Sequence, residues 1–465
     1  MGIPGLLKAL SDVQREVHVS ELRGLRVGLD GYCFLHRGKY SRAYELVNGQ
    51  TDGQAIFNPI LQVLRALLAA GAEPVLVFDG GQLPAKRLVE GARKEARDRA
   101  RWSANLQLQQ LQSLQPNSSS SSPSAGHAAN EDKREVIRRL SAGVDITPEI
   151  AVACMRKAEA MGVFCIVAPC EADAQLAALA HDNRIDVCAT EDVDLLVYGC
   201  PRVIFGLDRN GYGREIRLAE ISRSRGLSPY VPNPETLPDL CVFAGCDYLA
   251  PIPRVGLRTA AKFLHRAGGD LPRALALARR SGIQVPNDFL DRAREARLVF
   301  LCQTVFDIEE QRLRHLKMEP PAGAVLPTDW LGPALADDVA IGIACGEIHP
   351  MTHQPFAQQL KPALLALEAP TPPVAPTPST PALTWQEPTA SAPKQDPPQA
   401  PSTEHALASC TGPSGPDDGE GDEEDSESEE WCAEGSLLAA SAASTSCEEL
   451  LPPPAFAPSS SSSSS

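Results

Sequence analysis

Apolar residues in the first half of the chain form short runs that are separated by stretches of helical periodicity. Residues 57–71 carry apolar side chains at helical spacing and end at Gly71, a suitable C-cap. Residues 146–162 predict another helix, with Thr147 as N-cap and Pro148 in the first position. Short aliphatic or β-branched runs predict buried strands at residues 25–29, 74–78, 164–169, 186–190 and 202–207. This alternation predicts an α/β fold with a mostly parallel central sheet flanked by helices on both faces.

The rest of the chain divides by composition. Residues 86–111 are helical and charged, residues 115–130 are rich in serine and break all periodicity, and residues 234–299 return to a helical pattern. Beyond about residue 367 the chain is Pro, Ser, Thr and Ala with an acidic block, which predicts a disordered tail. We expect regions at 1–102, 103–132, 133–233, 234–350 and 367–465.

The net charge of −16 is concentrated in the tail. Between Ala369 and Ser465 sixteen Asp and Glu residues stand against a single Lys394, a net of −15. The remainder holds 42 basic and 43 acidic residues, so a cluster of acids at one site would leave the rest of that surface positive. A surface of this kind is compatible with a phosphate backbone as partner.

The thirteen cysteines form no C-x-x-C pair, which disfavours a zinc site. We expect most of them to be buried apolar thiols in a reducing compartment. The N-terminus lacks the pattern of a signal peptide, and no apolar stretch is long enough to span a bilayer. A soluble, intracellular protein is expected.

Acidic residues follow four of the predicted strands, and a further acid at a helix end is expected to join them. Ligands of open parallel sheets bind beyond the carboxyl ends of the strands, because the loops converge there. The expected cluster comprises Asp30, Asp79, Glu171, Asp173, Asp192, Asp194 and Asp247.

Carboxylates a few ångströms apart repel one another and take up protons unless a cation lies between them. All-oxygen ligation favours Mg²⁺ or Mn²⁺ over zinc, and two such ions about 4 Å apart can serve in-line phosphoryl displacement. Any one of these acids could equally be an N-cap or a turn residue, but the whole set favours a metal site.

Two further segments fit a nucleic-acid substrate. Residues 245–264 predict a helix–hairpin–helix whose turn at Gly256 could hold a DNA phosphate, although a plain helix–turn–helix packing unit fits equally well. Lys86, Arg93 and Arg97 are spaced to share one helical face that could clamp a scissile phosphate. The alternative is a solvated helix with Glu90 and Glu95 as ion-pair partners.

Six motifs in consistent order carry a family resemblance: MGIPGLL, LDGYCFLHRG, VFDGGQLPAKR, VAPCEADAQLA, ATEDVDLLVYG and LCVFAGCDYL. Together they resemble the flap-endonuclease superfamily of 5′ nucleases over about residues 1–350. The Glu171-Ala-Asp173 motif with the AQLA that follows it, and the YCFLHRG segment, are similar to the exonuclease 1 branch. We find no sliding-clamp motif of the kind that flap endonucleases carry.

The resemblance implies a PIN-like 5′-nuclease fold in which 1–102 and 133–233 form the nuclease region, 103–132 an arch with the flexible insertion, and 234–350 the hairpin and closing region. It implies two Mg²⁺ ions, replaceable by Mn²⁺, on the seven acids, and K⁺ at the hairpin. It also implies nuclear DNA repair and DNA ends, nicks and flaps as partners. The implied site residues are the catalytic pair Lys86 and Arg93 and, at the DNA, Gly2, Tyr32, His36, Arg97 and Gly256.

The chain departs from the family pattern at Cys170, where the exonuclease has Tyr, and at Arg254, where the hairpin has its first glycine. Arg254 weakens the expectation of K⁺ at the hairpin. The function expected first is Mg²⁺-dependent 5′→3′ double-strand DNA exonuclease activity with 5′-flap cleavage. A structure-specific flap or junction endonuclease is the alternative, and a non-catalytic DNA-binding scaffold is the alternative from another class. Since a degenerate copy should lose its mutually repelling acids first, the complete set favours an enzyme.

Overall fold

The computed structural model describes residues 3–47, 54–113, 141, 145–321, 326–327 and 329–356, which all lie in one compact unit, Met1–Glu387. Gly2, the 115–130 insertion and the tail from 367 lie outside these residues. Within the described ranges, no helix is long and apolar enough to cross a membrane, and the ten cysteines are buried and free.

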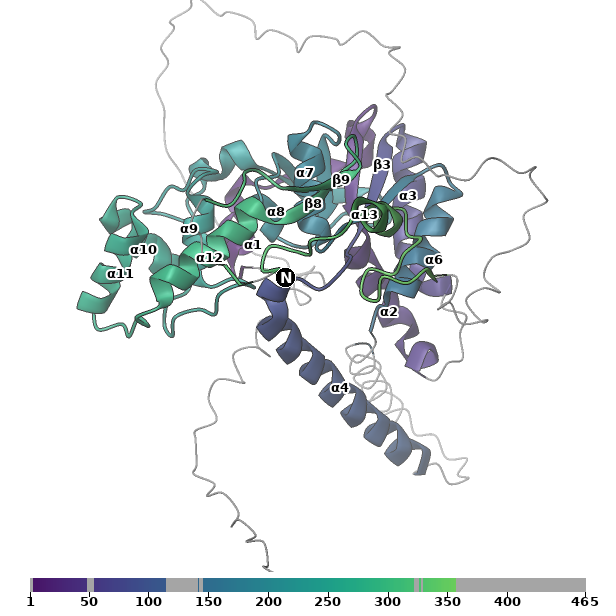
Figure 1. Ribbon diagram of the computed structural model, residues 1–465, viewed down its shortest axis with the longest axis horizontal. Helices are drawn as coiled ribbons and strands as arrows, with labels where there is room; N and C mark the ends of the chain where they lie inside the picture. The colour runs from purple at the N-terminus through teal and green to yellow at the C-terminus, as the bar shows by residue number, and fades with distance from the viewer. Residues whose placement is uncertain are drawn as a thin grey trace, which may run out of the picture. The chain divides into compact units, whose positions relative to one another are not determined.

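The central sheet has seven strands in the order β1-β7-β6-β5-β2-β3-β4 (Figure 1). The strands from β2 to β6 pair in parallel and coincide with the five predicted runs, which confirms the predicted sheet. β7 is antiparallel to β6, and β1 is antiparallel to β7 at the edge. The strands are β1 (Arg15–His18), β2 (Arg26–Asp30), β3 (Glu73–Phe78), β4 (Phe164–Val167), β5 (Val187–Thr190), β6 (Arg202–Phe205) and β7 (Tyr212–Arg217).

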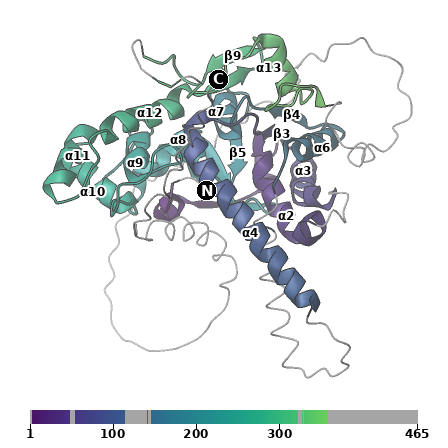
Figure 2. The same cartoon turned by 60° about the horizontal axis from the view of Figure 1, so that its bottom comes forward.

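Alternate residues of the strands point into two cores, one on each face of the sheet. In β3, Leu76 and Phe78 pack with the helices of one face, while Val75 and Val77 pack with the opposite face. Figure 2 shows α3 and α6 beside β3 and β4. The first face carries α2 (Gly31–Val47), α3 (Asn58–Ala70) and α6 (Pro148–Glu159), and the second carries α7 (Ala172–His181).

The predicted helix ends are largely correct. Gly71 closes α3 in the left-handed conformation (φ 79°), which glycine adopts without a steric penalty. Thr147 and Pro148 begin α6 as expected, although the Thr147 side chain makes no capping hydrogen bond.

The helical region after the sheet shares one of these two cores rather than forming a core of its own. Phe243, Phe289 and Phe300 lie in the same buried cluster as Leu176 of α7. The region comprises α9 (Leu237–Ala244), α10 (Leu257–Ala267), α11 (Leu271–Arg280), α12 (Phe289–Cys302), the antiparallel pair β8 (Thr304–Asp307) and β9 (Arg312–His315), and α13 (Asp337–Ala344).

A buried amide joins this region to the sheet. The side chain of Gln175 on α7, which is fully buried, accepts a hydrogen bond from the Phe306 N–H at 2.8 Å and donates to the Phe306 carbonyl at 2.9 Å. Because both bonds lie out of reach of water, β8 is fixed against α7 in one register.

The charged segment at 86–111 forms α4 (Arg87–Ser113), with one difference from the prediction. Lys86 lies in a 3₁₀ turn, Pro84–Lys86, before the helix begins, so it does not share a regular helical face with Arg93 and Arg97. The 3₁₀ turn, and not α4, therefore sets the position of the Lys86 ammonium.

Candidate active site

The strand order creates a switch point at the centre of the sheet. From β2 the chain proceeds outward through β3 and β4 on one side, and β5 and β6 lie on the other. Asp30 ends β2, Asp79 follows β3, and Asp192 follows β5, so the three carboxylates lie at the carboxyl edge around this point. Such an edge is where ligands bind in open α/β sheets.

A close backbone approach positions two of the acid-bearing loops. The Gly80 N–H donates to the Cys170 carbonyl at 2.6 Å, and a Cβ at Gly80 would stand 1.9 Å from the Ala168 oxygen. Only glycine permits this contact. It brings the loop after β3 against the loop after β4, where the Ala172 N–H at the start of α7 donates to Asp79 Oδ1 at 2.7 Å.

A chain of short hydrogen bonds links β2 to β5. The Thr190 hydroxyl donates to Asp30 Oδ2 at 3.1 Å, and it accepts from the Asp192 N–H at 3.0 Å. The Asp194 N–H donates to Asp192 Oδ1 at 3.2 Å. These bonds connect the end of β2 to the loop after β5, although Asp30 lies far from Asp192 and Asp194 in the sequence.

Burial and mutual repulsion raise the pKa of several of these acids. Burial is the main cause for Asp30, whose pKa rises to about 6, and for Asp79, whose pKa rises to about 7, with neighbouring carboxylates adding to both shifts. The same causes raise the pKa of Asp173 and Asp194 well above the usual range.

The cluster has the chemistry of a cation site. Within the described part of the chain, both carboxylate oxygens of Asp194 and Oδ1 of Asp173 are buried without a hydrogen-bond partner. Unpartnered buried oxygens of this kind fit a hard divalent ion. As the side chains stand, no three acidic, histidine or cysteine groups among the described residues are close enough to hold one ion.

Lys86 lies against the other end of the cluster. Its ammonium is 2.6 Å from Glu171 Oε1 and 3.3 Å from Asp247 Oδ2, and Arg93 contacts the same Asp247 oxygen at 2.9 Å. Although burial opposes both effects, these contacts raise the pKa of Lys86 and lower that of Asp247. The structure thus places Lys86 and Arg93 beside the acids.

The remaining predicted residues lie at varying distances from this cluster. Arg97 is paired with Asp145 at 3.6 Å rather than with the acids. The Tyr32 ring packs edge-on to Phe78 at 6.3 Å between centroids. Burial, and secondarily Lys39 and Arg97, lower the pKa of His36 to about 3, so its imidazole is neutral at physiological pH.

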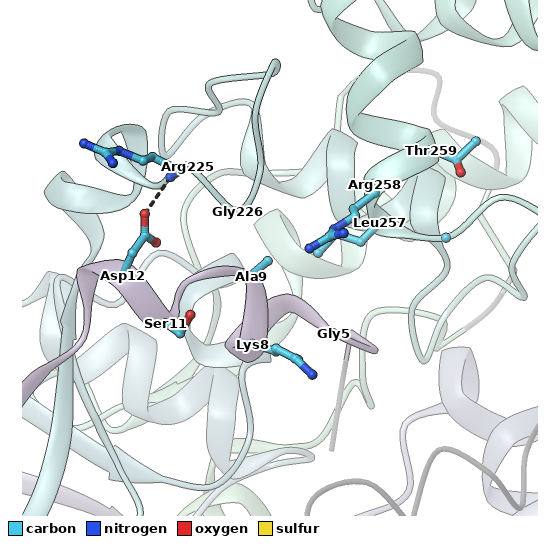
Figure 3. Close-up of a pocket in the computed structure, with 11 residues that line it drawn as sticks. Gly5, Lys8, Ala9, Ser11, Asp12, Arg225, Gly226, Leu257, Arg258 and Thr259 are labelled. Carbon is cyan, nitrogen blue, oxygen red and sulfur yellow. Dashed lines mark hydrogen bonds between the residues drawn. The ribbon is translucent and has the colours of Figure 1, made fainter. Parts of the chain in front are cut away.

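Gly256 caps α10 and lines an open pocket of about 850 Å³ (Figure 3). The basic residues of this pocket were not predicted, because nothing in the local pattern marks them. They come from α1 (Leu6–Ala9), from the loop after the 3₁₀ turn Leu218–Arg223, and from the first turn of α10, and they are Lys8, Arg225 and Arg258.

Arg254 keeps the turn conformation that a glycine would give. Its φ is +69°, in the left-handed region, and its guanidinium donates to the Gly282 carbonyl at 3.2 Å. The hairpin backbone is therefore held by a side-chain anchor at a position where L residues are strained.

Two family models match the chain where this site is built. The XPG N-terminal domain matches residues 1–100, and the XPG I-region matches residues 162–247. These ranges contain all seven acids and both Lys86 and Arg93. The chain belongs to the XPG and flap-nuclease superfamily.

Two relatives within the superfamily are exonucleases by name, and a third is named for its induction by DNA damage. Exonuclease 1 of Arabidopsis thaliana is 33% identical over 366 residues, which cover 78% of this chain and 46% of that protein. Exodeoxyribonuclease 1 of Schizosaccharomyces pombe is 34% identical over 358 residues, 77% of this chain and 58% of that protein. The DNA damage-inducible protein DIN7 of Saccharomyces cerevisiae is 30% identical over 309 residues, 66% of each chain. The chain spans about half the length of the exonuclease 1 relatives that it matches.

Solved structures of related nucleases also align with the chain. The catalytic core of Rad2 in complex with DNA substrate aligns with 64% of this chain and 85% of its own at 16% identity, with a TM-score of 0.43. The family is one of divalent-metal-dependent nucleases, which agrees with the unpartnered carboxylates described above.

Proposed function

We propose that this chain is a Mg²⁺-dependent 5′→3′ double-strand DNA exonuclease with 5′-flap endonuclease activity, acting in DNA repair in the nucleus. The observation that carries the proposal is the convergence of carboxylates from four strand ends on one edge of the sheet, beside Lys86. Membership in a nuclease superfamily and the names of the relatives support it.

The seven acids would hold two Mg²⁺ ions, for which Mn²⁺ could substitute. When bound, such ions activate the attacking water and stabilise the leaving oxygen of phosphodiester hydrolysis. The acids with unpartnered oxygens, Asp173 and Asp194, are the strongest candidates for direct ligands. The other side chains would have to draw together around the ions.

Lys86 and Arg93 would bind the scissile phosphate. Both now neutralise carboxylates, and both lie at the base of α4, where a phosphate entering the cluster would meet them. Fixed cations in a buried site stabilise the charge that develops in the transition state. Tyr32, His36 and Arg97, from α2 and α4, would contact the strand beside this phosphate, and Gly2 is proposed with them on the family resemblance alone.

The pocket at Gly256 would bind the DNA duplex at a point separate from the cleavage site. Its basic lining from Lys8, Arg225 and Arg258 suits a phosphate backbone, and the first turn of α10 also lines it. K⁺ at this hairpin is not part of the proposal, because Arg254 stands where the family's hairpin has its first glycine.

The test uses purified full-length chain with 5′-recessed, blunt and 5′-flapped duplexes, each labelled separately at either end. We expect Mg²⁺-dependent removal of nucleotides from the 5′ end, abolished by EDTA and by Asp192→Ala. The surface variant Asp288→Ala serves as the matched control and should retain wild-type activity.

Each alternative predicts its own pattern in the same assay. Cleavage confined to flaps would replace the exonuclease with a structure-specific endonuclease. Binding without cleavage of any substrate would indicate a scaffold. Degradation that survives both EDTA and Asp192→Ala would overturn the metal mechanism.

A further inference from the structure

A buried group of hydroxyls surrounds one oxygen of Glu171. The Tyr248 hydroxyl donates to Glu171 Oε2 at 2.7 Å, and the Tyr198 hydroxyl lies 3.3 Å from the same oxygen. The two hydroxyls are 2.5 Å apart, and Tyr198 also reaches Gln303 Oε1 at 2.6 Å. These residues flank four helices: one precedes α7, one follows α8 (Asp194–Val197), one lies after α9 and one follows α12.

The surroundings of this group exclude water. Tyr198 and Gln303 are fully buried and Tyr248 is 7% exposed. The Phe300 ring packs edge-on to both tyrosines, at centroid distances of 5.1 Å and 5.0 Å. Since a buried hydroxyl is costly unless it is hydrogen-bonded, each tyrosine keeps its single proton on one of these acceptors.

The result is that both oxygens of Glu171 have a defined partner. Oε2 takes the tyrosine hydroxyls, and Oε1 lies against the Lys86 ammonium at 2.6 Å. The Tyr248 ring adds to this, because the Lys86 ammonium stands 5.7 Å from its centroid. Asp194 is the contrast, since within the described residues neither of its carboxylate oxygens has a hydrogen-bond partner.

We propose that Tyr198 and Tyr248 are positioning residues that hold the Glu171 carboxylate in one orientation, toward Lys86 and a bound divalent ion, with Gln303 anchoring Tyr198. The proposal rests on the function proposed above. Groups that orient a ligating carboxylate lower the cost of organising it when the ion arrives. Neither tyrosine touches the substrate in this role.

The hydroxyls, rather than the rings, are what the proposal requires. Phenylalanine would pack equally well against Phe300, so Tyr198→Phe and Tyr248→Phe remove one oxygen each and leave the rings in place. Tyr230→Phe is the matched control, since Tyr230 is buried in the same core cluster but its hydroxyl bonds to Thr236 instead.

The experiment titrates Mn²⁺ into each DNA-free, metal-stripped protein by calorimetry, beside the thermal unfolding of each. We expect Tyr198→Phe and Tyr248→Phe each to weaken Mn²⁺ binding, and the double variant to weaken it by about 10-fold or more. The metal concentration that gives half-maximal DNA cleavage should rise by the same factor. Tyr230→Phe should bind Mn²⁺ as the wild type does.

The outcomes separate the two proposals. If the wild type neither binds Mn²⁺ nor cleaves DNA, the proposed function fails. If the wild type does both and the double Tyr→Phe variant matches it in Mn²⁺ affinity, with or without a lower melting temperature, the positioning role is wrong and the tyrosines serve packing alone.

Discussion

The ammonium of Lys86 lies 2.6 Å from Glu171 Oε1 and 3.3 Å from Asp247 Oδ2, so one buried cation bridges two acids of the cluster. This relationship gives Lys86 a structural role in the absence of metal as well as a proposed role toward phosphate.

Replacing Lys86 with Met should therefore destabilise the metal-free protein. Removing one partner of a buried ion pair leaves the other charge uncompensated and costs about 3 kcal/mol. Urea unfolding in EDTA measures this loss, and added Mg²⁺ should restore part of it, while cleavage falls on the order of 100-fold. Lys94→Met, at an exposed position of α4, should change neither. Equal stability of Lys86→Met and wild type in EDTA would contradict the role.

His36 should make the protein sensitive to acid. Its pKa is about 3 in the folded state, below the ordinary 6.5, so between these values the unfolded chain binds the extra proton. Stability is complete above pH 6.5 and declines as pH falls, by about 1–2 kcal/mol from this group at pH 5.

The measurement compares wild type with His36→Asn by urea unfolding at pH 7.5 and pH 5. The acid-induced loss should be smaller in His36→Asn, because contributions from all other groups cancel in the difference. His265→Asn, an exposed site on α10, should lose as much as wild type. The same loss in all three proteins would show that His36 is not buried in its neutral form.

Lys8 and Arg258 should contribute to DNA affinity without regard to base sequence. Both residues line the pocket at Gly256. Each phosphate contact that a basic side chain makes with DNA releases about one counterion. Lys8→Ala and Arg258→Ala should each lower the slope of log Kd against log salt by about one. Fluorescence anisotropy in Ca²⁺ at several salt concentrations measures this. Arg223→Ala, which removes a largely exposed arginine paired with Glu220, is the control and should leave the slope unchanged.

Arg254 should reveal the strain of its left-handed backbone when two replacements are compared. Arg254→Ala and Arg254→Gly both lose the bond to Gly282, but only alanine retains the steric penalty at φ +69°. The glycine variant should be more stable than the alanine variant by about 1 kcal/mol in urea unfolding. Equal stability would mean that the turn relaxes out of the left-handed conformation.

The strands at the centre of the sheet could be predicted from the sequence, but the antiparallel strand β7 near its edge could not. The parallel strands were predictable because their residues are apolar on both faces, as in Val75 to Phe78. β7 was missed because one of its inward residues is Glu215, which is 1% exposed and neutralised by Arg15, Arg202 and Arg217. A buried charge cancels the apolar alternation on which the prediction depends.

The acids at the strand ends could be found from the sequence because their position relative to each strand fixes where they lie. The groups that orient them could not be found in this way. Tyr198, Tyr248 and Gln303 meet Glu171 through contacts between segments 27 to 132 residues away from it, and no local pattern encodes such a meeting. Lys86 was predicted for the wrong local reason, since a 3₁₀ turn and not a helical face sets its place.

The two hydrogen bonds between Gln175 and Phe306 determine when the chain can complete its fold during synthesis. During synthesis, these two hydrogen bonds can form only after the segment around residue 306 has left the ribosome. A nascent or prematurely terminated product that ends before this segment would contain the acids that follow the early strands. It would contain neither the two bonds to Phe306 nor Gln303. Such a fragment would therefore lack the contacts that hold β8 to α7 and that anchor Tyr198 beside Glu171.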